Sequence, residues 1–325
     1  MAAKCRAIVF NGDGTYEMRQ FDKPTPPPGG AVIKVEAVGM CSSDIEQIKG
    51  HKHVPGEVAP VVAGHEMVGR VEALAKDAQF PVAVGDRVAV DLILRTGLYH
   101  EKLLLYGYTM GLDVEGGLWG GYGEYMCIAA GTNLMKVTES LPAEHVTVFE
   151  PLANAVNWVS TAGVRAGDTV VVQGPGHVGL MCIIAARMAG ASCVIATGTS
   201  GDALRLEAAR IAGPGAAAPC AVDITSRESV RRMIRFTVER FGGVDILINT
   251  AASFPSPDRE GRIRDEQWAS TLAVNVTANY LLADELVAAA GRHRLFSAWT
   301  FSRDLSKYRQ TGARAQAFPP APYQY

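Results

Sequence analysis

One glycine-rich loop limits the possible folds of this chain more than any other feature. The stretch VVVQGPGHVGL places Gly-x-Gly-x-x-Gly directly after an apolar run and directly before a helical pattern. Gly174 permits a tight turn, Gly176 lets the backbone approach a pyrophosphate, and Gly179 lets the helix pack on the strand. The helix start, at His177 and Val178, offers unpaired N–H groups to an anion. The loop predicts a dinucleotide site, and a glycine turn without a ligand is the alternative.

The sequence around this loop changes texture near residue 157. From there, short apolar runs such as DTVVVQG, SCVIATG and VDILINTAA alternate with amphipathic helical patterns, which predicts parallel βαβ units. The first half has short alternating strands broken by Gly and Pro, which is typical of a compact β domain. We therefore predict an α/β chain with a mostly β domain over 1–156, a doubly wound parallel sheet over 157–295 and an irregular tail over 296–325.

The strand after the glycine loop bears on cofactor choice. In dinucleotide-binding folds, an Asp or Glu at the end of this strand commonly accepts a hydrogen bond from the 2′-hydroxyl of the adenosine ribose. This chain has Gly198 there, followed by Thr199, Ser200 and Arg205. Hydroxyl donors and a cation suit a 2′-phosphate, so the pattern leans toward NADP. Arg205 also fits as a solvated helix residue.

Composition excludes several classes of partner. The chain has 325 residues, is 48% hydrophobic and carries a formal charge of −2, so no concentrated basic face is expected for nucleic acid or an anionic membrane. No apolar run has the length of a signal peptide core or a membrane span, which predicts a cytoplasmic location. The six cysteines form no CxxC pair, which argues against a disulfide framework and an all-cysteine metal site.

Four residues in three separate stretches could hold a metal. Cys41 lies in GMCSSD, His65 and Glu66 in AGHEMVGRV, and Glu150 in VFEPLANAV. Catalytic zinc takes three protein ligands from Cys, His and carboxylate groups and leaves one position open. Each residue also has a purely structural interpretation. Cys41 could be a core thiol and His65 a core histidine, while Glu66 could be a solvated acid and Glu150 a charge at a helix N-terminus. Together they have the donor types and the number that a zinc site needs.

The ordered series of motifs resembles a known family. GMCSSD, GHEMVGRV, VGDRVAV, GGYGEYM, EPLANAV and GPGHVGL are similar to the zinc-dependent medium-chain dehydrogenase/reductases, in particular the sorbitol and threonine dehydrogenase-like branch. The resemblance covers about Lys4 to Gly213. It implies a GroES-like catalytic domain, a Rossmann cofactor domain, and hydride transfer between an alcohol or polyol and NAD(P).

The resemblance also implies roles for individual residues. Cys41 and His65 match zinc ligands, and Glu150 matches the third ligand, reached directly or through water. Glu66 matches a carboxylate that approaches the metal in exchange with water. Asp44 matches the acid that hydrogen-bonds the zinc histidine and fixes its tautomer.

The same comparison implies a route for the proton. Ser43 matches the hydroxyl that takes the alcohol proton, after zinc has made the alcohol more acidic. Position 46 often carries a histidine that ends the relay, and here it is Glu46. Either Glu46 or water then carries the proton onward.

Two further departures from the family lie downstream. Many relatives have a four-cysteine lobe that binds a structural zinc, but LILRTGLYHEKLLLYGYTMGLDVEGG contains no cysteine. We therefore expect one zinc per chain. After about residue 221 the sequence resembles a short-chain dehydrogenase/reductase, with Asn249 to Ala252 similar to its NNAG strand end and Asn275 to its helix asparagine. Thr250 and Ala251 of that strand end are expected to contact the cofactor.

The short-chain resemblance is incomplete. Its catalytic YxxxK is missing, because Tyr308 has no Lys at the fourth following position, and its N-terminal TGxxxGxG is absent. The first hypothesis is a zinc-dependent alcohol or polyol dehydrogenase with a small-molecule substrate, assembled as a homo-oligomer. The alternative is an inactive hybrid that retains dinucleotide binding. A zinc-free quinone or enoyl reductase is disfavoured by Cys41, His65 and Glu150 together.

Overall fold

The structure is a computed structural model that describes residues 3–52, 54–94, 104–212, 220–255, 262–289 and 294–297. Its contacts divide the chain into two compact units, with the boundary between Glu150 and Pro151. The sequence-based boundary lies after residue 156, a few residues further along. Within the described residues, no helix is long and apolar enough to span a lipid bilayer.

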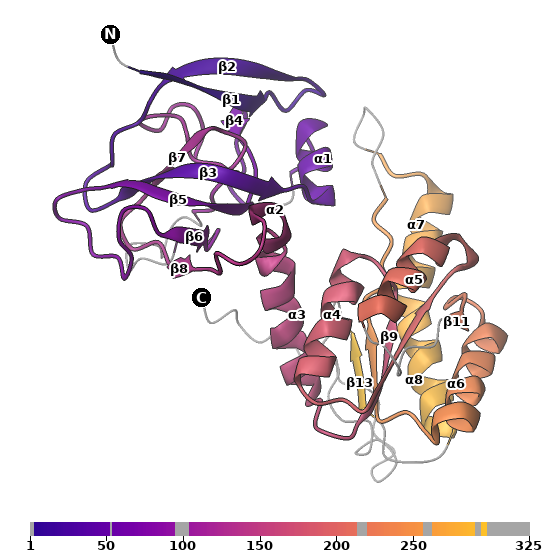
Figure 1. Cartoon of the computed structure of the whole chain (residues 1–325). Coiled ribbons are helices and arrows are strands. Elements are labelled where there is room, and N and C mark those ends of the chain that lie inside the picture. The colour runs from indigo at the N-terminus through magenta and orange to yellow at the C-terminus, as the bar shows by residue number, and fades with distance from the viewer. Residues whose placement is uncertain are drawn as a thin grey trace. The chain divides into compact units, whose positions relative to one another are not determined.

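The first unit is built on two antiparallel sheets (Figure 1). The smaller sheet has the order β2-β1-β4 and consists of β1 (Lys4–Phe10), β2 (Tyr16–Asp22) and β4 (Val61–Val62). The larger sheet has the order β7-β3-β5-β6-β8 and consists of β3 (Ala31–Gly39), β5 (Glu66–Leu74), β6 (Arg87–Val90), β7 (Tyr125–Ile128) and β8 (Leu134–Lys136). This largely β architecture confirms the prediction for the first half of the chain.

Alternation along the strands makes the core of the first unit. In β1, Cys5, Ala7 and Val9 point inward and are buried, while Lys4 and Arg6 are exposed. This period of two is what a half-buried strand requires. Helices α1 (Ser42–Ile48) and α2 (Ala143–Val146) lie within the described residues of this unit. Helix α1 follows β3 closely and contains Ser43, Asp44 and Glu46.

The second unit is a parallel sheet with the order β11-β10-β9-β12-β13. Its strands are β9 (Thr169–Gln173), β10 (Cys193–Gly198), β11 (Cys220–Ala221), β12 (Ile246–Asn249) and β13 (Arg294–Ser297). The order of strands reverses between β9 and β12, which is the switch point where doubly wound sheets bind ligands. The predicted doubly wound sheet is confirmed, and the stretch that resembles a short-chain enzyme continues the same sheet through β12.

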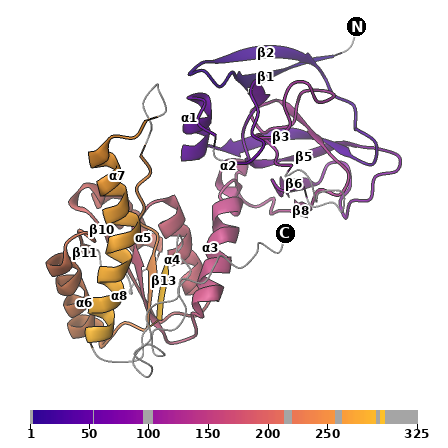
Figure 2. The same ribbon diagram turned by 180° about the vertical axis from the view of Figure 1, so that it is seen from behind.

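Helices cover both faces of this parallel sheet (Figures 1 and 2). One buried cluster joins Val170, Val172 and Ile246 to α4, while the other joins Val171 and Leu247 to α6 and α8. Strands buried on both faces explain the continuous apolar runs in the sequence. The helical segments are α3 (Phe149–Ala162), α4 (His177–Met188), η1 (Ser200–Asp202), α5 (Ala203–Ala212), α6 (Arg227–Phe241), α7 (Asp265–Leu272), the π-helical η2 (Ala273–Thr277) and α8 (Ala278–Ala288).

The predicted start of the irregular tail, residue 296, lies inside a strand of the structure. Phe296 and Ser297 belong to β13, which pairs in parallel with β12, Ile248 opposite Phe296 and Asn249 opposite Ser297. The run RLFS has only four residues, which is too short a pattern to predict a strand from sequence. Its pairing with the buried strand β12 identifies it as one. The remainder of the predicted tail, from 298 to 325, lies outside the described residues.

Candidate functional site

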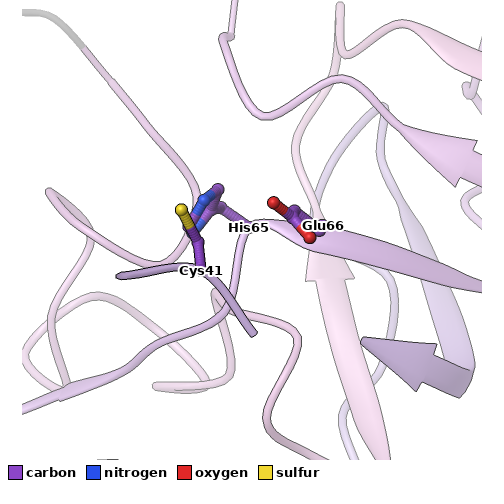
Figure 3. Close-up of side chains that lie close together, drawn as sticks. All are labelled: Cys41, His65 and Glu66. Atoms are coloured by element: carbon purple, nitrogen blue, oxygen red, sulfur yellow. The ribbon is translucent and has the colours of Figure 1, made fainter. Parts of the chain in front are cut away.

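Three of the four predicted metal ligands lie together in the first unit. The ligand atoms of Cys41, His65 and Glu66 are all within 4.8 Å of one another (Figure 3). The register of the larger sheet produces this, because Gly39 at the end of β3 pairs with Glu66 at the start of β5. A Cβ at Gly39 would collide with the Glu66 carboxylate, so a larger residue there would force that carboxylate out of its present position. The fourth predicted ligand, Glu150 in α3, is not a member of this group.

His65 is held through its ring nitrogen Nδ1. Its Nδ1 lies 3.1 Å from the Tyr108 hydroxyl and 3.4 Å from Asp44 Oδ1, which leaves Nε2 for a metal. Burial of the ring opposes its charged form, but Asp44 and Cys41 outweigh burial and raise the pKa of His65 to about 10. A metal must displace that proton, since only the neutral imidazole ligates.

Asp44 is built into this arrangement by the start of helix α1. Its Oδ2 accepts a 2.7 Å hydrogen bond from the Cys41 N–H and a 3.1 Å bond from the Tyr122 hydroxyl. Its Oδ1 is buried and has no hydrogen-bond partner among the described residues, and it faces His65 Nδ1. A buried carboxylate oxygen costs free energy unless a donor meets it. When Nε2 of His65 ligates a metal, the ring has its hydrogen on Nδ1, and this N–H can donate to Asp44 Oδ1.

The donor set fits zinc. A thiolate, an imidazole and a carboxylate are the ligand types of open catalytic zinc sites. His65 and Glu66 are only 6% and 7% exposed, so two of the donors are removed from bulk water, while Cys41 is half-buried. Within the part of the chain that the structure describes, this is the one group of three or more metal-ligating side chains.

The two predicted proton carriers have partners that the sequence did not reveal. Ser43 Oγ lies 2.9 Å from the Tyr108 hydroxyl. Glu46 binds Lys49 Nζ at 2.7 Å and His51 Nδ1 at 2.6 Å. Lys49 and His51 lower the pKa of Glu46 against the opposing effect of burial, so this carboxyl is ionised at neutral pH.

The glycine loop of the second unit lies between β9 and α4. Gly174 has φ of +97°, which L side chains rarely adopt, and its carbonyl accepts a 2.9 Å hydrogen bond from Thr250 Oγ1. A Cβ on Gly176 would meet nothing within 4 Å, which leaves space for a ligand at the start of α4. A Cβ on Gly179 would collide with the Gly174 carbonyl. Ala251 lies beside Gly174, so the end of β12 borders the loop as expected.

The short helix η1, which follows the end of β10, contains an acid that sequence reasoning missed. Asp202 Oδ2 accepts hydrogen bonds from Thr199 N at 2.9 Å and Thr199 Oγ1 at 2.8 Å. Asp202 Oδ1 pairs with Arg205 at 3.0 Å. A Cβ on Gly198 would lie 3.1 Å from Asp202 Oδ2, so the carboxylate occupies the space above Gly198. The signal was a capping box, Thr199 followed three residues later by Asp. Ser200 is exposed.

The short-chain part of the second unit is held by asparagines. Asn275 Oδ1 accepts from Ser253 N and Asn275 Nδ2 donates to Ser253 O, both at 2.8 Å. Asn249 Nδ2 donates to Asn279 Oδ1 at 2.9 Å. These bonds fix the segment after β12, where Thr250 and Ala251 lie. Tyr308 and Lys307 lie outside the described residues.

Comparisons with known proteins decide the family. Residues 27–139 match the family model described as alcohol dehydrogenase GroES-like domain, and residues 178–299 match the one described as enoyl-(acyl carrier protein) reductase. The chain is 35% identical over 272 residues to the protein named "Probable alcohol dehydrogenase adh" of Mycobacterium tuberculosis, covering 78% of this chain and 71% of that protein. This chain is a zinc-type medium-chain dehydrogenase.

Other relatives of this dehydrogenase agree. The erythritol/L-threitol dehydrogenase of Mycolicibacterium smegmatis is 33% identical over 222 residues, covering 62% of this chain and 60% of that protein. Among solved structures, the 2R,3R-butanediol dehydrogenase of Bacillus subtilis aligns with a TM-score of 0.61 and 28% identity, covering 77% of this chain and 71% of that one. Both confirm the family resemblance read from the motifs, and the second family match confirms the short-chain resemblance.

Proposed function

We propose that this dehydrogenase transfers a hydride between an alcohol or polyol and NAD(P), with one zinc per chain. The observation that carries the proposal is the group formed by Cys41, His65 and Glu66, in a chain that also has an open glycine loop before α4. Glu150 is retained as a further ligand, direct or through water. The cytoplasmic location and the homo-oligomer inferred from the sequence are part of the same proposal.

Separate groups of residues bind the metal, accept the proton and bind the cofactor. Zinc, when bound, supplies Lewis-acid chemistry that makes an alcohol more acidic, and the nicotinamide supplies the hydride acceptor. Cys41, His65 and Glu66 hold the metal. Ser43, half-buried in the first turn of α1, takes the proton that the alcohol releases. Gly176 and the N–H groups at the start of α4 bind the pyrophosphate.

Glu46 is suited to receive that proton next. It lies three residues after Ser43 on α1, and residues at this spacing share one face of a helix. His51 contacts the Glu46 carboxylate at 2.6 Å, so an ionised acid and an imidazole lie side by side near the surface. The pair can pass a proton to solvent, and water remains the alternative carrier.

Zinc content and activity together test the proposal. Full-length protein expressed with zinc should contain about one zinc per chain by elemental analysis, the pattern of an open catalytic site. It should oxidise at least one member of a panel of polyols, sugars and simple alcohols with NAD or NADP. Two zincs, or none, would contradict the stoichiometry. One zinc and bound cofactor without turnover would favour the inactive hybrid instead.

Cofactor selectivity gives a second test, because the sequence leans toward NADP while the Asp202 carboxylate, which lies over Gly198 and pairs with Arg205, opposes a 2′-phosphate. Asp202→Asn should raise NADP affinity relative to NAD about fivefold, since removing the repulsion between two close unit charges is worth about 1 kcal/mol in water. Asn can still accept the Thr199 N–H bond. The ratio of the two dissociation constants, measured by titration, gives the result.

The controls for this test come from the structure. Glu207→Gln removes an exposed acid from the same helical region, where it pairs with Arg210, and should leave the ratio unchanged. Gly198→Asp is a poor substitute, because its Cβ would lie 2.8 Å from the Pro175 ring. An unaltered ratio in Asp202→Asn would mean that the 2′-position lies away from Asp202.

A further inference from the structure

The Tyr108 side chain contacts both the predicted proton acceptor, Ser43, and the predicted metal ligand, His65. Its hydroxyl lies 2.9 Å from Ser43 Oγ and 3.1 Å from His65 Nδ1. Only 5% of the residue is exposed, and its ring is 5.2 Å from the imidazole at an interplanar angle of 44°. Tyr108 lies in YGYTMGL, within the stretch where relatives have their cysteine lobe. The proposed function assigns it no role.

Tyr108 is held in place independently of these two contacts. Its backbone N–H donates to the Leu105 carbonyl at 3.2 Å, and its carbonyl accepts from the Val58 N–H at 2.9 Å. A phenol ordinarily titrates at a pKa of about 10, so the Tyr108 hydroxyl has its proton near neutral pH. A fixed, protonated hydroxyl can accept one hydrogen bond and donate another at the same time.

Zinc ligation gives this chain of hydrogen bonds a direction. When Nε2 of His65 ligates, the ring proton must be on Nδ1, where it is shared between the Tyr108 oxygen at 3.1 Å and Asp44 Oδ1 at 3.4 Å. The Tyr108 hydrogen is consequently directed to Ser43 Oγ. Ser43 then has its own hydrogen turned outward and one lone pair left to accept a proton, which is the state that a relay hydroxyl needs.

We infer that Tyr108 is a positioning residue that couples the zinc-ligating histidine to the proton-accepting serine. The inference rests on the proposed function and deepens it. Through His65, the phenol fixes the tautomer and ring orientation of a metal ligand. Through Ser43, it sets the direction in which the relay hydroxyl points. Asp44 shares the first task, since its Oδ1 is 3.4 Å from the same ring nitrogen.

Tyr108→Phe tests the link to His65 by a measurement that needs no turnover. Removing the hydroxyl while keeping the ring should weaken zinc binding about tenfold, because partners of metal-ligating histidines typically contribute about 10–100-fold to affinity. Zinc affinity is measured by competition with a chromophoric chelator. Thermal melting reports any loss of fold.

Tyr106→Phe is the matched control. Tyr106 is also a buried tyrosine of the same loop, and its hydroxyl binds Thr132 Oγ1 at 2.6 Å and the Ala129 N–H at 2.8 Å, away from the metal group. Its loss should lower the melting temperature without changing zinc affinity. Equal zinc affinities for Tyr108→Phe and the parent protein would overturn the link to His65.

A double-mutant cycle with Ser43→Ala tests the second link. Tyr108→Phe alone should lower kcat about tenfold with little change in KM, as expected for a group that acts on the reacting step. In the Ser43→Ala background, measured at saturating zinc so that weaker zinc binding does not contribute, the same change should have no further effect on kcat. Independent, additive effects on kcat would overturn the link to Ser43. A parent protein that binds zinc without turnover would refute the proposed function, while the zinc affinities would still decide the coupling to His65.

Discussion

His65→Ala is expected to lower dehydrogenase activity by at least about a thousandfold, because a bound Lewis acid contributes several kcal/mol and each ~1.4 kcal/mol is a factor of ten. The same protein should contain little zinc. The loss has a geometric cause, since His65 is the single imidazole in the group with Cys41 and Glu66. Turnover under saturating cofactor and zinc content by elemental analysis are the two measurements.

Two controls separate this loss from general damage. His145→Ala removes an exposed histidine of α2 in the same unit and should leave zinc and activity unchanged. Tyr308→Phe should also remain active, because the sequence offers Lys307 and Tyr308 only as neighbours and not as the YxxxK that short-chain catalysis uses. Activity that persists in zinc-free His65→Ala would mean that the chemistry belongs to the other half of the chain.

The sequence predicted those parts of the site that local pattern determines. The glycine loop was recognisable because a tight turn, a close approach and a helix contact each demand glycine at a fixed spacing. Cys41, His65 and Glu66 were recognisable as a set because family motifs contain them. Their contact depends on the pairing of β3 with β5, in which Gly39 faces Glu66, and the strand patterns did not predict that pairing.

The contacts that the sequence did not predict are long-range or depend on side-chain direction. Tyr108 is 65 residues from Ser43 and 43 from His65, and no motif marks it. Asp202 was overlooked because the expected acid belongs at the position of Gly198, whereas here a capping turn brings a carboxylate back over that glycine. Glu150 matches a ligand by motif, but the structure does not include it in the group with Cys41, His65 and Glu66.

Ser43→Ala should lower kcat about 10²- to 10⁴-fold, the usual contribution of a positioned proton-transfer group. Zinc content and cofactor affinity should stay at parent values, because Ser43 is not among the ligand atoms and lies outside the glycine loop. Ser42→Ala is the matched control, since Ser42 is the exposed first residue of the same helix. Its kcat should equal that of the parent protein.

The next proton carrier after Ser43 can be identified by a second substitution on the same helix. If Ser43 hands its proton to Glu46, then Glu46→Gln should lower kcat as well, because Gln cannot take up a proton near neutral pH. If water carries the proton instead, Glu46→Gln should leave kcat near the parent value while Ser43→Ala still loses activity. A Ser43→Ala protein with parent kcat would remove the relay altogether, and the bond between Ser43 and Tyr108 would then be structural only.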